Sequence, residues 1–124
     1  MPIHSINHAQ LAFPAGAEGP IRHFYGDLLC LPEVRLRADE ILRFAAGTQR
    51  IDLVPTAGGQ AAPAVSHLAF QVSDLPALRG RLLQAQWALE EHQALPGYLR
   101  FYAQDPAGNR LEFLEPDTEH GYNP

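Results

Sequence analysis

"GYLRFYAQDPAGNRLEFLE", residues 97–115, contains two alternating apolar and polar segments that are separated by a turn. The Asp-Pro and Gly-Asn steps of "QDPAGN" are typical turn signals. The flanking segments are rich in aromatic and aliphatic residues with a period of two, as in half-buried strands. The stretch therefore predicts a hairpin with strands at 98–104 and 109–115.

Glu112 and Glu115 interrupt the apolar run of the second predicted strand. Side chains alternate between the two faces of a strand, so Leu111 and Phe113 share one face and Glu112 lies on the other. We expect Glu112 to face a surface different in character from the core. Glu115, at the strand end and on the outer face, is expected to be solvated.

The residues before this hairpin predict a strand, a helix and a weaker strand. "VSHLAFQV", residues 65–72, alternates as a strand, and a weaker strand pattern lies around 88–93. Between them Asp74 is a good N-cap, and Pro76 lies in the first helical turn. The apolar stripe of the predicted helix consists of Leu75, Leu78, Leu82 and Ala85.

The first half of the chain shows the same order of elements. Residues 3–13 alternate as a strand, and a helix is predicted to begin near Pro20 and to end at Leu31-Pro32. The stripe of this helix consists of Ile21, Phe24, Tyr25, Leu28 and Leu29. Three further short strands are predicted at about 33–37, 41–46 and 50–54.

Each half thus reads as strand, helix and three strands, an internal repeat of about 59 residues. Residues 55–64 hold no charge and no large apolar side chain, and we interpret them as a linker. The sequence predicts an α+β fold with two βαβββ modules, at about 3–54 and 65–116, within one domain that covers residues 1–124. We expect helices to cover one face of the sheet and to leave the other face open.

The composition limits the classes of protein that need to be considered. The 124 residues fit one domain of roughly 100–150 residues, and 46% apolar residues suffice for a core. A net charge of −5 lacks the basic surplus of a nucleic-acid binder. No apolar run approaches the ~18 residues of a membrane span and the first residues do not read as a signal peptide, so we expect a cytoplasmic protein. Cys30, the single cysteine, excludes an internal disulfide and is expected to be a small buried apolar residue.

Four chemically useful side chains share the open face of the predicted strands: His8, Asp52, His67 and Glu112. The sequence separation is 44 residues for His8 and Asp52, and 45 for His67 and Glu112. An alignment of the two "LAF" segments would shift the repeat to 57 residues and match His67 with Gln10 instead of His8. Either shift keeps every side chain on its face.

Two imidazoles with one or two carboxylates are a suitable ligand set for a divalent metal. Two histidines and one carboxylate would also form the facial triad of non-haem iron oxygenases. The period of two places these side chains on one face, but it does not establish that they converge.

Four segments of the sequence resemble the vicinal oxygen chelate superfamily, which includes glyoxalase I, extradiol dioxygenases, methylmalonyl-CoA epimerase and the fosfomycin and bleomycin resistance proteins. These segments are "NHAQLAFP", "FYGDLLCLPEV", "SHLAFQVSDLPALRGRL" and "GYLRFYAQDPAGNRLEFLE". The closing hairpin is the most specific of them, and the resemblance covers about residues 5–116.

The resemblance implies paired βαβββ modules that form a cup-shaped mixed sheet around one site, usually in a homodimer. The family's metal ligands then fall on His8, His67 and Glu112, and the fourth ligand of glyoxalases and epimerases falls on Asp52. Asp52 is one methylene shorter than the usual Glu. Cys30 stands where the family usually has Gly, so we expect a local difference in that connection. The resemblance leaves open whether the site lies within one chain or between two.

Two functions follow from this resemblance. The first is a metal-dependent enzyme in which a divalent ion (Fe, Zn, Ni, Co or Mn) binds adjacent oxygens of a small substrate. Glu112, or else Asp52, would move a proton in a glyoxalase-like or epimerase-like reaction, whereas in a dioxygenase-like reaction Asp52 would lie outside the ligand set. The second is a metal-free binding protein that sequesters a drug, as bleomycin resistance proteins do. For either function, Arg43, Arg100 and Tyr102 are candidate substrate contacts.

Overall fold

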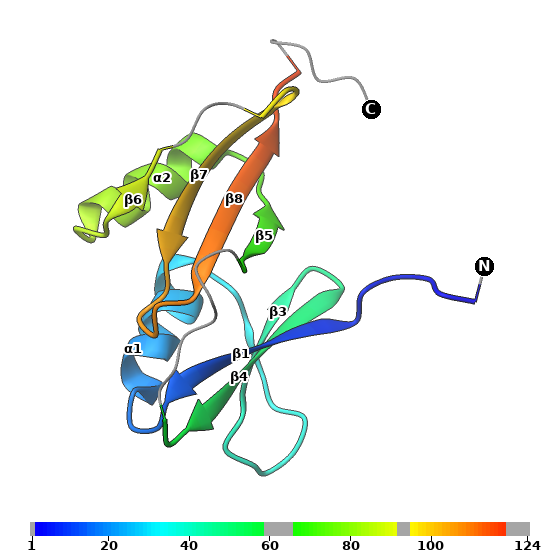
Figure 1. Ribbon diagram of the computed structural model, residues 1–124, viewed down its shortest axis with the longest axis vertical. Helices are drawn as coiled ribbons and strands as arrows, with labels where there is room; N and C mark the ends of the chain where they lie inside the picture. The colour runs from blue at the N-terminus through cyan, green and yellow to red at the C-terminus, as the bar shows by residue number, and fades with distance from the viewer. Residues whose placement is uncertain (1, 59–65, 92–94, 119–124) are drawn as a thin grey trace. The chain divides into compact units, whose positions relative to one another are not determined.

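The computed structural model of the protein describes residues 2–58, 66–91 and 95–118 (Figure 1). The chain divides into two compact units. The first consists of Met1–Ala62 with Pro106–Asn109, and the second of Pro63–Asp105 with Arg110–Pro124. No helix in the described ranges is long and apolar enough to cross a membrane.

Each unit is a βαβββ module with a four-stranded mixed sheet. The sheets have the same strand order, β1-β4-β3-β2 and β5-β8-β7-β6, and in each the first strand is parallel to the last. The first unit contains β1 (His8–Pro14), α1 (Glu18–Arg22), the π-helix η1 (His23–Leu28), β2 (Glu33–Val34), β3 (Leu42–Ala46) and β4 (Gln49–Thr56). The second contains β5 (Leu68–Gln71), α2 (Leu75–Gln84), β6 (Leu89–Glu90), β7 (Tyr98–Gln104) and β8 (Arg110–Pro116). The predicted α+β fold class with two repeated modules is confirmed.

Several predicted boundaries differ from the structure. The strand predicted at 3–13 begins only at His8, and the strand predicted at 65–72 is described from Leu68 to Gln71. The linker predicted at 55–64 begins within β4, which continues to Thr56, and its residues 59–64 lie outside the described residues. Of the weak strand around 88–93, Leu89–Glu90 form β6, and residues 92 and 93 are not described.

The core of the first unit lies between its helical region and one face of its sheet. The predicted stripe is correct at four positions, because Ile21, Phe24, Tyr25 and Leu28 are all buried. The Tyr25 ring stacks on Phe44 of β3 with 5.6 Å between ring centroids. Phe13, Phe44, Ile51 and Leu53 present the complementary apolar face of the sheet.

Residues 23–28 form a π-helix in place of the predicted α-helical turns. The backbone then reverses at Cys30, which has a φ of 59°, and the Leu31 N–H donates to the Tyr25 carbonyl across it. Cys30 therefore adopts the left-handed conformation that usually favours glycine. The prediction that Cys30 is buried is wrong, since the residue is exposed.

The core of the second unit lies under α2. Phe113 of β8 packs against Phe70 and Phe101, at centroid separations of 5.6 Å and 5.3 Å. Leu75, Leu78 and Leu82 are buried as predicted, whereas Ala85 is the exposed C-cap residue. Asp74 is the N-cap, as predicted, and its side chain accepts a hydrogen bond from the Ala77 N–H.

Glu115 is not simply solvated, contrary to the prediction. It is half-buried, and its carboxylate accepts hydrogen bonds from the backbone N–H groups of Asp74 (2.6 Å) and Leu75 (3.0 Å). These donors open α2, where the helix itself supplies no acceptors. Of the two glutamates in the closing strand, Glu115 therefore fixes the helix, and Glu112 lies on the opposite face.

The strand register decides how the two halves correspond. Asp52 is paired with Gln10, and Glu112 is paired with Ala69. His8 and His67 each lie two residues before the strand partner of a carboxylate. The structure therefore matches His8 with His67, which supports the repeat of 59 residues and not the alternative of 57.

Candidate functional site

The open face of the second unit carries a cluster of polar side chains around Glu112. His67 Nε2 lies 2.9 Å from Glu112 Oε1, and Arg100 Nη1 donates to Glu112 Oε2 at 3.2 Å. Arg100 also donates to the Tyr102 hydroxyl at 3.3 Å. The predicted ligands His67 and Glu112 and the predicted substrate contacts Arg100 and Tyr102 thus lie together.

Strand pairing explains this cluster. Tyr102 of β7 is directly opposite Glu112 of β8, and Arg100 is two residues away on the same face. Glu112 and Tyr102 are buried, with 5% and 6% of their surfaces exposed. The His67 ring meets the Tyr102 ring edge-on at 5.4 Å. The Glu112 carboxylate is therefore held on both of its oxygens in a largely desolvated position.

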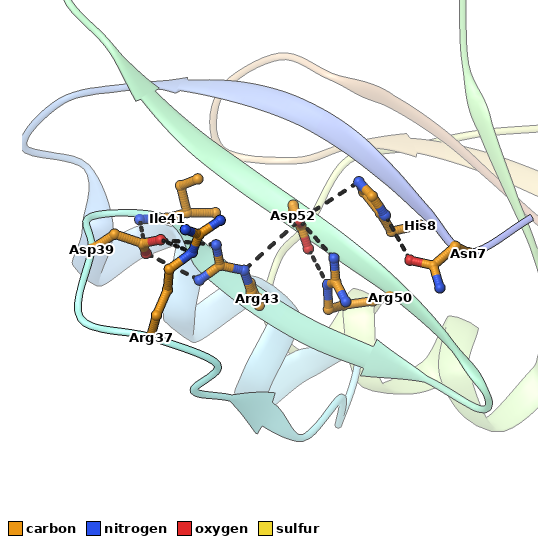
Figure 2. A network of polar contacts seen from close by, with 8 residues as sticks. All are labelled: Asn7, His8, Arg37, Asp39, Ile41, Arg43, Arg50 and Asp52. Carbon is orange, nitrogen blue, oxygen red and sulfur yellow. Dashed lines mark hydrogen bonds and ion pairs between the residues drawn. The ribbon is translucent and has the colours of Figure 1, made fainter.

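The open face of the first unit carries a second cluster around Asp52 (Figure 2). Arg50 donates to both carboxylate oxygens of Asp52, at 2.6 Å from Nε and 3.1 Å from Nη2. Arg43 Nε lies 3.8 Å and His8 Nε2 lies 3.9 Å from Asp52 Oδ2. The hydrogen bond to Asp52 raises the pKa of Arg50 above its usual value.

His8 is oriented by its neighbour in the chain. Its Nδ1 lies 2.8 Å from Asn7 Oδ1, which can only accept a hydrogen bond, so Nδ1 carries the proton. In the neutral imidazole, Nε2 then keeps its lone pair. Such an arrangement is common for histidines that bind a metal, because the bond at one ring nitrogen fixes the tautomer of the other.

Arg43, the third predicted substrate contact, is deeply buried, with 5% of its surface exposed. Its guanidinium group donates from Nη1 and Nη2 to the two oxygens of Asp39, at 3.0 Å and 2.9 Å. This hydrogen bonding lowers the pKa of Asp39 and raises the pKa of Arg43. Arg43 Nε is buried and has no hydrogen-bond partner among the described residues.

Two arginines that were not among the predicted site residues belong to these clusters. Arg50 binds Asp52, and the Arg110 guanidinium lies 4.0 Å from the centroid of the Tyr102 ring. Both precede an inward carboxylate by two residues and so share its face. The signal was present in the sequence as the repeated pattern of Arg, one residue, and Asp or Glu.

Within either unit, the described residues bring together one imidazole and one carboxylate. No group of three or more His, Cys, Asp or Glu side chains suited to hold a metal lies within one unit there. The other histidines show no partner pattern in the sequence, and we interpret them as surface residues; His4 and His23 are exposed, and His92 and His120 lie outside the described residues.

Several solved structures are similar to this chain. A Bacillus anthracis protein described as belonging to the glyoxalase family is 31% identical, with a TM-score of 0.84 over 93% of this chain and 97% of its own. A lactoylglutathione lyase from Agrobacterium tumefaciens is 21% identical (TM-score 0.73, 93% and 96% covered). TnmS3, an antibiotic binding protein from Streptomyces sp. CB03234, is 17% identical (TM-score 0.75, 94% and 99% covered).

No family model and no curated protein matches the sequence. Kinship therefore rests on the 31% identity to the Bacillus anthracis protein over nearly all of both chains, together with the repeated βαβββ topology. On this evidence the chain belongs to the glyoxalase family, within the vicinal oxygen chelate superfamily.

Proposed function

We propose that this protein is a metal-dependent enzyme of the vicinal oxygen chelate type that acts on a small substrate with two adjacent oxygen atoms. The observation that carries the proposal is the His67–Glu112 pair, with 2.9 Å between Nε2 and Oε1 on the open face of the second unit. Beside it, Arg100 and Tyr102 supply the polar groups that a small oxygenated substrate needs for orientation.

The distance between His67 Nε2 and Glu112 Oε1 suits two ligands of one divalent ion. Two ligand atoms at about 2.1 Å from one ion and at right angles lie about 3 Å apart. The 2.9 Å between His67 Nε2 and Glu112 Oε1 matches this separation once the shared proton has left. His8 is also a suitable ligand, because its Nδ1–H is hydrogen-bonded to Asn7 and its Nε2 can bind the ion.

Asp52 fits less well as a ligand, because Arg50 already holds both of its oxygens. A metal would have to displace this pair. We therefore propose His8, His67 and Glu112 as the ligands, from one chain or from the two chains of a homodimer. Asp52 is then a positioning residue 3.9 Å from His8 Nε2.

When bound, the divalent ion would act as a Lewis acid toward the two oxygens of the substrate. Arg100 fixes the Glu112 carboxylate by donating to Oε2, which leaves Oε1 for its partner on the open face. Tyr102 limits solvent access from the β7 side, since it is buried beside Glu112. In an isomerase or lyase reaction, Glu112 is the residue that would take and return a substrate proton.

The proposal is tested by elemental analysis of protein purified without chelator or metal-affinity resin. We expect close to one metal ion per chain in the wild type, loss of the ion in His67→Ala and Glu112→Ala, and retention in His23→Ala. His23 is the matched control because it is an exposed histidine whose side chain pairs with Asp27. Protein that is metal-free and does not take up added divalent ions would contradict the proposal.

A second candidate function is metal-free binding of a small molecule. One observation favours it: each inward carboxylate already has an arginine partner, Arg50 for Asp52 and Arg100 for Glu112. Among the structural neighbours, TnmS3 is an antibiotic binding protein. If the protein lacks metal and does not acquire it, saturable binding of a small drug-like ligand would support this second function.

A further inference from the structure

The segment that connects β2 with β3 lines a pocket that contains neither Asp52 nor Glu112 and shares only Arg43 with the cluster around Asp52. The pocket has a volume of about 360 Å³, within the range of small-molecule sites, and lies entirely within the first unit. Four arginines line it, out of nine basic residues in the whole chain. They are Arg22, Arg35, Arg37 and Arg43, and we refer to this site as the arginine pocket.

The charges of the arginine pocket do not balance. The acidic lining residues are Glu33 and Asp39, and Asp52 lies 3.8 Å from Arg43 Nε, so four guanidinium groups face three carboxylates. This local excess of positive charge stands in a chain with a net charge of −5. Fixed positive charge of this kind attracts an anionic ligand.

The two lining carboxylates are each engaged by one arginine. Arg22 donates to both oxygens of Glu33, at 3.0 Å and 3.1 Å, and this bond lowers the pKa of Glu33. Arg43 holds both oxygens of Asp39 in the same way, and Figure 2 shows this pair. These two pairs form a rigid charged wall, because bidentate contacts fix the planes of both groups.

Arg35 and Arg37 reach the same carboxylates only as longer ion pairs, at 3.7 Å from Glu33 and 3.4 Å from Asp39. Their side chains are 80% and 77% exposed. Most of their N–H donors are therefore open to solvent at the edge of the pocket. A guanidinium group in this position can bind a carboxylate or a phosphate through two parallel hydrogen bonds.

The remaining lining is largely apolar and includes Val34, Leu36, Ile41 and Leu42. Leu36 is one of the exposed large apolar residues of the chain, with 56% of its surface exposed. An inorganic anion would leave this apolar lining uncovered, whereas an organic anion would cover it.

We propose that the arginine pocket binds a small organic oxyanion, with its phosphate or carboxylate group held by Arg35 and Arg37 and its apolar body against Leu36 and Ile41. The site needs no metal and does not depend on the proposed enzymatic function. Arg43 links the arginine pocket to the cluster around Asp52, because it binds Asp39 and its Nε lies 3.8 Å from Asp52 Oδ2. An anion in the pocket would therefore lie close to the open face that carries His8 and Asp52.

The proposal is tested by calorimetric titration of the full chain with phenyl phosphate, phenylacetate and inorganic phosphate. We expect saturable 1:1 binding of at least one organic anion, weakened about tenfold or more in R35Q/R37Q. The matched control is R79Q/R81Q, which removes the same charge from α2. Its affinity is expected to stay within about twofold of the wild type.

The tighter of the two organic anions identifies the head group as phosphate or carboxylate. Equal affinity in the wild type and in R35Q/R37Q would overturn the proposal, as would an absence of saturation by either organic anion at about 10 mM. Inorganic phosphate that binds as tightly as phenyl phosphate would overturn the role of the apolar lining. Both arginines are exposed, so the variants are expected to fold, which thermal unfolding checks.

Discussion

Cys30 holds a backbone conformation that is unfavourable for a residue with a side chain. Its φ of 59° lies in the left-handed region, where Cβ crowds the following carbonyl at a cost of about 1–2 kcal/mol. The family usually has glycine here, and the sequence predicted a local difference at this position. The structure shows that the left-handed turn is kept and the cysteine adopts it.

Replacing Cys30 with glycine is expected to stabilise the protein. The relief of strain exceeds the entropy that glycine adds to the unfolded chain, which leaves a gain of about 0.5–1 kcal/mol. The free energy of unfolding in urea measures this gain. Cys30→Ala is the control, because it removes the sulfur but keeps Cβ. A glycine variant no more stable than the alanine variant would show that the turn is not strained.

Glu115 stabilises the fold, whereas Cys30 strains it, because the Glu115 carboxylate accepts hydrogen bonds from two backbone N–H groups at the start of α2. Glu115→Ala is expected to lower the free energy of unfolding by about 1–2 kcal/mol, as the loss of a helix cap does. Glu115→Gln retains one acceptor oxygen and is expected to fall between the wild type and the alanine variant. Urea denaturation of the three proteins measures these differences. A decrease in the free energy of unfolding of less than about 0.3 kcal/mol in the alanine variant would refute the capping role.

The strands show which features of the site the sequence could predict. Alternation of side chains along 98–104 and 109–115 placed Arg100, Tyr102 and Glu112 on one face, and the structure brings them into contact. The same alternation places Arg110 on the face of Glu112 and Arg50, in the first unit, on the face of Asp52, but it does not indicate what either arginine binds. Partner choice depends on cross-strand register and side-chain length, which a single sequence does not specify.

The connection between β2 and β3 was less predictable. The sequence predicted strands at about 33–37 and 41–46, whereas β2 ends at Val34, so Arg35 and Arg37 lie in the connection. Their pairing with carboxylates is visible only once β2 and β3 are aligned, with Val34 opposite Arg43. The π-helix at His23–Leu28 was also not predicted, since its apolar residues match the spacing of an α-helix.

The Arg22–Glu33 and Arg43–Asp39 pairs of the arginine pocket predict that the stability of the protein depends on pH. Hydrogen bonds from Arg22 and Arg43 lower the pKa of Glu33 and Asp39 from their ordinary values of 4.5 and 3.8. Groups with a lowered pKa in the folded state add stability above the ordinary value, and this stability is lost as the pH falls through the folded pKa. We therefore expect the melting temperature to fall less steeply between pH 5 and about pH 3 in E33Q/D39N than in the wild type. Parallel curves for the two proteins would contradict this account.

At the scale of the whole molecule, neither unit is one continuous segment. Pro106–Asn109 belong to the first unit although β7 and β8 on both sides belong to the second. Asn109 is buried, and its Nδ2 donates to the Ala12 carbonyl of β1 at 2.8 Å. The sequence predicted the turn at this position, but it did not predict its long-range contact, because 97 residues separate the two partners.

Loss of this contact is expected to destabilise the fold. Asn109→Ala should lower the free energy of unfolding by about 1–3 kcal/mol, since it removes a buried side chain that donates to the Ala12 carbonyl. Asn109→Asp has nearly the same shape but cannot donate from its carboxylate, so it should be destabilised at least as much. The measurement is equilibrium unfolding in urea, and wild-type stability of the aspartate variant would contradict the role of this hydrogen bond.

We proposed that His8, His67 and Glu112 hold one divalent ion, and a titration with Co²⁺ followed by visible absorption is the sharpest test of that proposal. We expect saturation at one equivalent per chain in the wild type, with the signal abolished in both His8→Ala and His67→Ala. Two equivalents per chain, with one lost in each variant, would mean two independent sites. A titration without any saturable signal would contradict the metal-dependent function itself.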